Sequence, residues 1–176
     1  MFTDPVKNLK AFGLREDNIV ADLGAGTGYY TVAAAHIVNN GKVYAVEITK
    51  DFLVTIKNKV SELHLKNVEI LWGNVEKIGG THIGDNIVDA VIASNVFFQV
   101  EDKNNFIEEI KRILKKGGRV LLVDWELEVK ENGAFPKRKG ALTKAMAHDM
   151  FESKGFTLER YVDAGAHHYG MILVKN

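Results

Sequence analysis

The strongest constraint on the fold is an alternation of two hydrophobic patterns along the chain. Short β-branched runs at residues 19–23, 43–47, 68–72, 88–93 and 119–124 are separated by longer stretches with helical period. Nearly continuous apolar strands are typical of a parallel sheet that is covered on both faces. The alternation therefore predicts an α/β fold with a doubly wound, Rossmann-like sheet.

Both ends of the chain add elements to this pattern. Residues 1–17 contain an Asp-Pro pair followed by Gly13, which predicts a short N-terminal helix. Two further strands, within 156–175, are joined by a short connection and should form an antiparallel hairpin. The glycine, proline and basic residues of 127–142 predict a loop near the active site. The helix before the fifth strand is expected to end at Lys115-Lys116-Gly117-Gly118, where glycine permits a left-handed cap.

Size and composition narrow the class of protein. The chain has 176 residues, no cysteine, and 23 basic against 23 acidic residues, so we expect one domain over 1–176. No apolar run is long enough to span a membrane and no apolar leader opens the chain, which predicts a cytoplasmic protein. Balanced charge provides no overall field for nucleic acid or a membrane surface, so binding to either would have to come from a local patch, which weakens both as partners. Composition leaves the oligomeric state open between a monomer and a homodimer.

The most informative motif is DLGAGTG at 22–28, a buried strand that runs directly into a glycine-rich turn. Glycines allow a ligand to approach the backbone, and the helix that follows offers free N–H groups. Glu47 ends the next strand 23 residues after Gly24, close to the offset at which a carboxylate accepts from ribose hydroxyls. The third glycine of the dinucleotide fingerprint is missing, since Tyr29 occupies its place. Asp22 also suits a cofactor with an ammonium and a sulfonium, and together these features favour S-adenosyl-L-methionine.

These residues resemble the class I S-adenosylmethionine-dependent methyltransferases, and in particular the small-molecule branch with the ubiquinone and sterol enzymes. The resemblance covers about residues 15–175. It rests on five motifs in order: DLGAGTG at 22–28, Glu47, GNVE at 73–76, DAVIASN at 89–95 and LKKGGRV at 114–120. It implies a seven-stranded sheet of order 3-2-1-4-5-7-6 with strand 7 antiparallel.

The resemblance also assigns the cofactor site. The glycine turn would hold the methionine part, Glu47 the ribose, and Asn74 and Val75 the adenine. The expected cofactor-binding residues are Asp22, Gly24, Ala25, Gly26, Gly28, Tyr30, Glu47, Ile48, Asn74, Val75 and Ser94. Where the family often has an aspartate, Asn74 is uncharged, which predicts a modest loss of cofactor affinity. The N-terminal segment is short for the family, so the pocket is expected to be open or closed by another element.

The expected reaction transfers a methyl group to a small-molecule acceptor by an in-line displacement that leaves S-adenosyl-L-homocysteine, in which alignment and exclusion of water provide much of the rate. The candidate catalytic residues, placed where they can contact the acceptor, are Asn95, Asp124 and Trp125, at the carboxyl ends of the fourth and fifth strands, with Asp124 as the candidate proton acceptor. Asp124 is also interpreted as a capping acid, the interpretation that its position alone favours. The histidines at 167 and 168 are interpreted as surface residues. We find no recognisable ligand spacing and predict no metal.

Three alternatives stay open at this point. The first is an RNA or protein methyltransferase that uses Lys137, Arg138 and Lys139 to attract its substrate. The second is a domain that binds the cofactor without catalysis. The third is a nicotinamide-dependent reductase.

Overall fold

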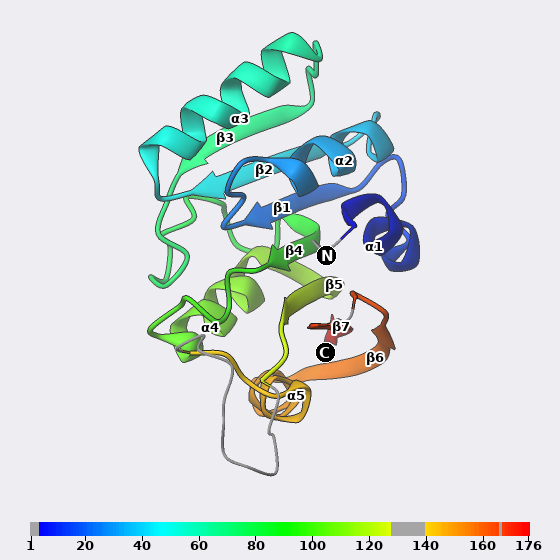
Figure 1. Cartoon of the computed structure of the whole chain (residues 1–176), viewed down its shortest axis with the longest axis vertical. Helices are drawn as coiled ribbons and strands as arrows, with labels where there is room; N and C mark the ends of the chain where they lie inside the picture. The colour runs from blue at the N-terminus through cyan, green and yellow to red at the C-terminus, as the bar shows by residue number, and fades with distance from the viewer. Residues whose placement is uncertain (1–3, 128–139, 166) are drawn as a thin grey trace.

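The computed structural model describes residues 4–127, 140–165 and 167–176. Its strands form one seven-stranded sheet of order β3-β2-β1-β4-β5-β7-β6. Figure 1 shows this sheet from β3 at the top to β6 at the bottom, with helices on both sides. The predicted fold class and strand order are confirmed.

The parallel part of the sheet consists of β1 (Ile19–Leu23), β2 (Lys42–Glu47), β3 (Val68–Trp72), β4 (Val88–Ser94) and β5 (Leu114–Trp125). The last two strands, β6 (Phe156–Val162) and β7 (His168–Lys175), pair as a hairpin, and β7 is antiparallel to β5. Because β1 to β5 run in the same direction, their carboxyl ends meet at one edge of the sheet. A ligand crevice is expected outside this edge.

Each face of the sheet has its own hydrophobic core. On one face Val20 packs with residues of α1 (Pro5–Phe12) and α2 (Tyr29–Ile37). On the other face Ala21 packs with residues of α4 (Lys103–Ile113) and α5 (Lys144–Glu152). The remaining helix, α3 (Lys50–Glu62), contacts β2 and β3. Successive residues of a strand point to opposite faces, so both faces must be apolar.

The chain ends follow the sequence prediction closely. Asp4 caps α1 by accepting a hydrogen bond from the Lys7 N–H at 3.1 Å, and Gly13 ends the helix at φ +70°.

The Leu127 N–H donates to the Leu142 carbonyl at 3.1 Å and so joins the two ends of the predicted loop. Residues 128–139, which include Lys137, Arg138 and Lys139, lie outside the described residues.

The expected helix end at residues 115–118 is wrong. Helix α4 ends at Ile113, and Leu114 is already extended. The β4–β5 ladder shifts register between Val88 and Ala90, so residues 115–118 form an irregularity within β5. Lys115 pairs with Asp89 at 2.7 Å, and this long-range contact explains why a helix-capping pattern was misleading.

Candidate active site

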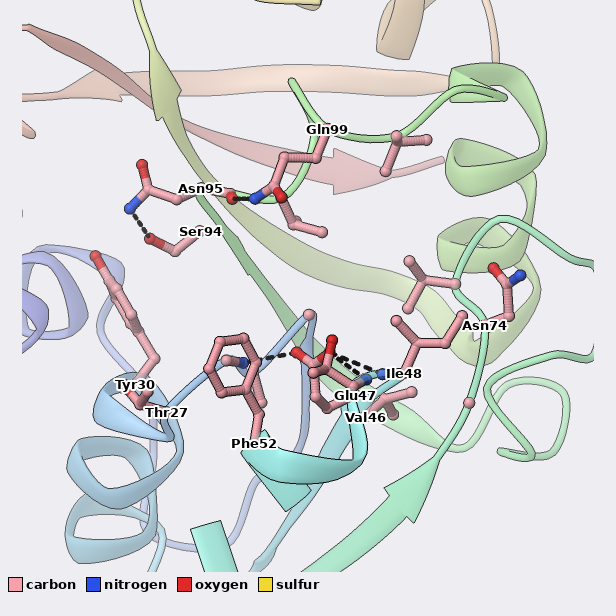
Figure 2. A pocket seen from close by; sticks show the side chains of 18 of the residues that line it. Thr27, Tyr30, Val46, Glu47, Ile48, Phe52, Asn74, Ser94, Asn95 and Gln99 are labelled. Atoms are coloured by element: carbon pink, nitrogen blue, oxygen red, sulfur yellow. Dashed lines mark hydrogen bonds between the residues drawn. The ribbon is translucent and has the colours of Figure 1, made fainter. Parts of the chain in front are cut away.

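A cavity of about 830 Å³ lies at the carboxyl ends of β1 to β4. Figure 2 shows two groups of side chains around it. We name one group the β2–β3 end, which consists of Glu47, Ile48, Asn74 and Val75. The other is the β4 end, which consists of Tyr30, Ser94, Asn95 and Gln99. The turn at residues 24–27 also lines the cavity.

The glycine turn is held against β2 by main-chain hydrogen bonds. The N–H groups of Gly24 and Ala25 both donate to the Val46 carbonyl, at 2.9 and 3.1 Å. Gly24 has φ +69°, and a Cβ there would lie 2.5 Å from Val96 Cγ2. Gly26 has φ +53°. A left-handed conformation with no room for a side chain explains why glycine is needed at position 24.

Glu47 connects the end of β2 to this turn. Its Oε2 accepts from the Gly26 N–H at 2.9 Å, and its Oε1 accepts from the N–H groups of Ile48 and Thr49 at 2.8 Å each (Figure 2). The side chain is 6% exposed and lines the cavity. A carboxylate has about four acceptor positions, so one remains for a ligand hydroxyl.

Asp22 lies beneath the turn and is not among the residues that line the cavity. It is 2% exposed, and its Oδ2 accepts from the Thr31 hydroxyl at 2.6 Å. Burial, with a smaller contribution from the charge of Glu47, raises the pKa of Asp22 to about 7. Gly28, at the N-terminus of α2, is also absent from the lining. These two predicted residues therefore do not line the cavity, and their role as cofactor-binding residues stays a prediction.

The loop after β3 brings Asn74 and Val75 to the cavity. Asn74 Oδ1 accepts from the Glu76 N–H at 2.9 Å, while the Asn74 N–H donates to the Gly80 carbonyl at 3.0 Å. The predicted adenine-side residues thus have fixed positions next to Ile48.

A buried carboxylate that the sequence analysis missed anchors this loop. Glu109 of α4 accepts from the N–H of Gly79 at 2.8 Å and from the Thr81 hydroxyl at 2.6 Å. It also pairs with Arg112 at 2.8 Å, and these interactions hold the pKa of Glu109 below its usual value despite burial. Its partners in the loop lie about thirty residues away in sequence, and no local pattern points to them.

The β4 end combines neutral polar groups. Asn95 has φ +55°, which is uncommon for a non-glycine residue. Its N–H donates to the Val123 carbonyl at 2.8 Å, and its carbonyl accepts from Gln99 Nε2 at 2.7 Å. The Tyr30 hydroxyl accepts from Asn8 Nδ2 at 2.7 Å. Tyr30, Ser94 and Asn95 line the cavity, as predicted.

Asp124 and Trp125 are not on the cavity wall. The Asp124 carboxylate is fully buried, and accepts from the N–H groups of Phe98 at 3.1 Å and Trp125 at 2.7 Å. Burial raises the pKa of Asp124 to about 6, although these hydrogen bonds oppose the shift. This arrangement matches the capping interpretation of Asp124. Of the three candidates for contact with the acceptor, only Asn95 lines the cavity.

His168 differs from its interpretation as a surface residue. It is 8% exposed, its Nε2 lies 2.9 Å from Asn95 Oδ1, and its ring centroid is 4.0 Å from that of Trp125. Its neighbour His167 is exposed, as expected. The register of the β5–β7 pair places His168 opposite Trp125, which sequence alone does not specify.

One cluster on α5 corrects the prediction about metal spacing. The possible ligand atoms of His148, Asp149 and Glu152 lie within 4.8 Å of one another. His148 and Glu152 are four residues apart on a helix, so the expectation that the chain has no ligand spacing is wrong. All three lie away from the cavity lining, and Asp149 and Glu152 are exposed. The absence of a metal stays a prediction.

The charges of the cavity fit a cationic ligand. Among the described lining residues, Glu47 and Glu76 are acidic and none is a lysine or arginine. S-adenosylmethionine carries an ammonium and a sulfonium against one carboxylate. The cradle at Gly24 and Gly26 and the acceptor capacity of Glu47 therefore suit this cofactor.

Among the residues that the structure describes, no helix has the length and apolar character to cross a bilayer.

Comparison with known proteins identifies the family. Residues 14–164 match the family model described as a methyltransferase domain. The crystal structure of a SAM dependent methyltransferase from Aquifex aeolicus is 31% identical, with a TM-score of 0.87 over 99% of this chain and 91% of that chain. The [4+2]-cyclase SpnF, 14% identical over 92% of this chain and 76% of its own, has a TM-score of 0.81 and shares the fold alone.

A curated relative is the demethylmenaquinone methyltransferase of Bacillus mycoides strain KBAB4. It is 29% identical over 119 residues, which make up 67% of this chain and 49% of that protein. The chain thus spans about half the length of the curated relatives it matches. The predicted family and its cofactor, S-adenosylmethionine, are confirmed. This chain belongs to the class I S-adenosylmethionine-dependent methyltransferases.

Proposed function

We propose that this protein transfers a methyl group from S-adenosylmethionine to a small, uncharged acceptor. The observation that carries the proposal is the cavity, which has two chemically different ends and a volume of about 830 Å³. Ligand pockets range over roughly 300–1,000 Å³, so this one has room for a cofactor and a small acceptor together.

The β2–β3 end has the groups that would hold the cofactor. The backbone of residues 24–27 would contact the amino-acid part, Glu47 the ribose, and Ile48, Asn74 and Val75 the adenine. When bound, S-adenosylmethionine supplies an electrophilic methyl group. Glu47 places a carboxylate beside the turn, which favours a ligand with positive charge.

The β4 end would hold the acceptor. Its described polar side chains are those of Tyr30, Ser94, Asn95 and Gln99, and all are uncharged. Such groups orient an acceptor by hydrogen bonds and exclude water without providing a counter-charge. The buried Asp124 accepts hydrogen bonds from two backbone N–H groups, and we assign it the role of stabilising the wall of the site rather than contacting the acceptor. We therefore assign the rate gain to positioning.

The curated relatives support an acceptor of the quinol type. Their name, demethylmenaquinone methyltransferase, specifies a neutral ring compound as the molecule that they methylate. A neutral ring is consistent with the uncharged side chains of the β4 end. The match to about half of each relative makes this acceptor class part of the proposal.

Transfer of isotope-labelled methyl groups tests the proposal. The full chain is incubated with methyl-labelled S-adenosylmethionine and a panel that contains reduced naphthoquinols, phenols, RNA and protein. We expect label in an organic-extractable small molecule, at least tenfold above the Glu47→Ala variant, with Glu69→Ala as the exposed-carboxylate control. Label confined to RNA or protein, or no label in any fraction, would contradict the acceptor class.

A further inference from the structure

Asn95 is held in place at the β4 end by contacts on both its backbone and its side chain. Its left-handed backbone, at φ +55°, is held from both sides, by the Val123 carbonyl and by the Gln99 side chain. Asparagine tolerates this conformation better than most residues, but the conformation still has a cost. An uncommon backbone geometry that several contacts maintain is typical of a functional position.

The side chain of Asn95 is fixed by His168. The His168 Nε2 lies 2.9 Å from Asn95 Oδ1, and the Asn95 Nδ2 lies 3.4 Å from the Ser94 hydroxyl. Figure 2 shows the Asn95 amide nitrogen turned toward Ser94, at the β4 end of the cavity. An amide oxygen only accepts hydrogen bonds, so in this arrangement His168 Nε2 carries the proton and donates it.

The His168 ring is itself held in place. It begins β7, is 8% exposed, and pairs across the ladder with Trp125, whose ring centroid is 4.0 Å away. Asn95, which directly follows β4, thus forms a cluster with Trp125 of β5 and His168 of β7. His168 itself does not line the cavity.

From this geometry, and resting on the function proposed above, we propose that His168 is a positioning residue that selects the acceptor. By donating from Nε2 to Asn95 Oδ1, it keeps the Asn95 NH₂ group turned toward the cavity. An N–H donor at this point matches an uncharged acceptor with an oxygen that accepts a hydrogen bond beside the atom to be methylated, such as the ring oxygen of a quinol. With the opposite amide orientation, the site would present an oxygen and would favour an N–H donor on the acceptor.

The tautomer of His168 tests the first half of the proposal without any acceptor. A long-range ¹⁵N–¹H NMR spectrum of the full chain, labelled in histidine, reports which ring nitrogen carries the proton. The His168 signal is assigned by its loss in His168→Gln, while His167→Gln on the same hairpin leaves it in place. We expect the Nε2–H form at pH 8. A His168 ring protonated on Nδ1 alone would overturn the proposal, because Asn95 would then be the donor.

Kinetics test the second half. The probe is a dithionite-reduced 2-isoprenyl-1,4-naphthoquinol, with S-adenosylhomocysteine affinity measured separately by calorimetry. For His168→Ala we expect kcat to fall at least tenfold while S-adenosylhomocysteine affinity stays within about twofold. His168→Gln should recover kcat to within about threefold of the unsubstituted protein, because glutamine also presents an N–H donor at that reach.

The outcomes separate the two proposals. If the unsubstituted chain does not methylate the naphthoquinol, the proposed acceptor class fails, and the NMR result alone decides the role of His168. Equal kcat values for the unsubstituted chain, His168→Ala and His168→Gln would overturn the positioning role while leaving the proposed function intact. Loss of S-adenosylhomocysteine binding in His168→Ala would also overturn it, because the residue would then act on the fold rather than on the acceptor.

Discussion

The two ends of the cavity are built in different ways. At the β2–β3 end, the turn and Glu47 hold the cofactor position through main-chain groups, as in the bonds from Gly26, Ile48 and Thr49. At the β4 end, the position of Asn95 depends on side chains, including one that is 73 residues away in sequence. The geometry of the β2–β3 end thus depends on main-chain groups around one carboxylate, whereas the geometry of the β4 end depends on side-chain contacts between distant strands.

We expect the greatest loss of cofactor affinity from a substitution at the β2–β3 end of the cavity. Glu47→Gln replaces one of two acceptor oxygens with a donor, which then faces the N–H of Gly26 or those of Ile48 and Thr49. We expect the affinity for S-adenosylhomocysteine to fall about 100-fold, equivalent to roughly 3 kcal/mol. Calorimetry measures this. The control is Glu69→Gln, an exposed carboxylate on edge strand β3, and an equal affinity in both variants would contradict the role of Glu47.

The second prediction is that Asp22 makes the free energy of unfolding depend on pH. Its pKa in the folded protein, about 7, lies above the ordinary value of 3.8, so the charged form destabilises the folded state. The contribution of Asp22 to stability should therefore be greatest below about pH 4 and fall as the pH rises toward 7. We expect Asp22→Asn to gain on the order of 2 kcal/mol relative to the unsubstituted protein between pH 5 and pH 8.

Urea unfolding at both pH values checks this expectation. The asparagine introduced by Asp22→Asn would keep an oxygen that accepts from the Thr31 hydroxyl, so the variant changes charge with little change in shape. Asp17→Asn, at an exposed position, serves as the control. A stability difference between the unsubstituted protein and Asp22→Asn that does not vary with pH would show that burial of Asp22 does not shift its pKa as described.

Asp124 tests whether the wall of the β4 end is structural. Its two oxygens accept from different N–H groups, and asparagine has only one oxygen to offer. We expect Asp124→Asn to change the unfolding free energy at pH 8 by less than about 1 kcal/mol, because relief from the buried charge, whose pKa is raised to about 6, offsets the lost acceptor. The affinity for S-adenosylhomocysteine should stay within about twofold. Urea unfolding and calorimetry measure the two quantities. An unchanged stability combined with lost methyl transfer would instead support a direct catalytic role.

We expect the smallest change in cofactor affinity from a substitution at Asn74. Asn74 Oδ1 already accepts from the Glu76 N–H, so Asn74→Asp keeps this bond and adds a second, charged acceptor. We expect about a threefold gain in affinity for S-adenosylhomocysteine, measured by calorimetry at pH 8. An unchanged affinity would contradict contact between position 74 and the adenine, and Asp51→Asn on the exposed first turn of α3 provides the control.

The sequence predicts most of the fold and of the cofactor end, because both depend on local patterns. Strand alternation predicts the doubly wound sheet and the family resemblance predicts its order, while the spacing from Gly24 to Glu47 predicts that both residues line one cavity. The sequence does not predict the anchoring role of Glu109, whose partners lie in a distant loop. Nor does it predict the burial of His168, which depends on the β5–β7 register. The misplaced helix end at residues 115–118 has a similar cause, since the Lys115–Asp89 pair and the strand ladder override a local capping pattern.

We expect S-adenosylmethionine to bind at the carboxyl ends of β1, β2 and β3. Calorimetric titration of the unsubstituted chain with S-adenosylhomocysteine, and in parallel with NADH, tests it most directly. We predict saturable one-to-one binding of S-adenosylhomocysteine with a Kd of roughly micromolar order, and no heat from NADH. Binding of NADH, or no binding of S-adenosylhomocysteine at about 1 mM, would contradict the claim.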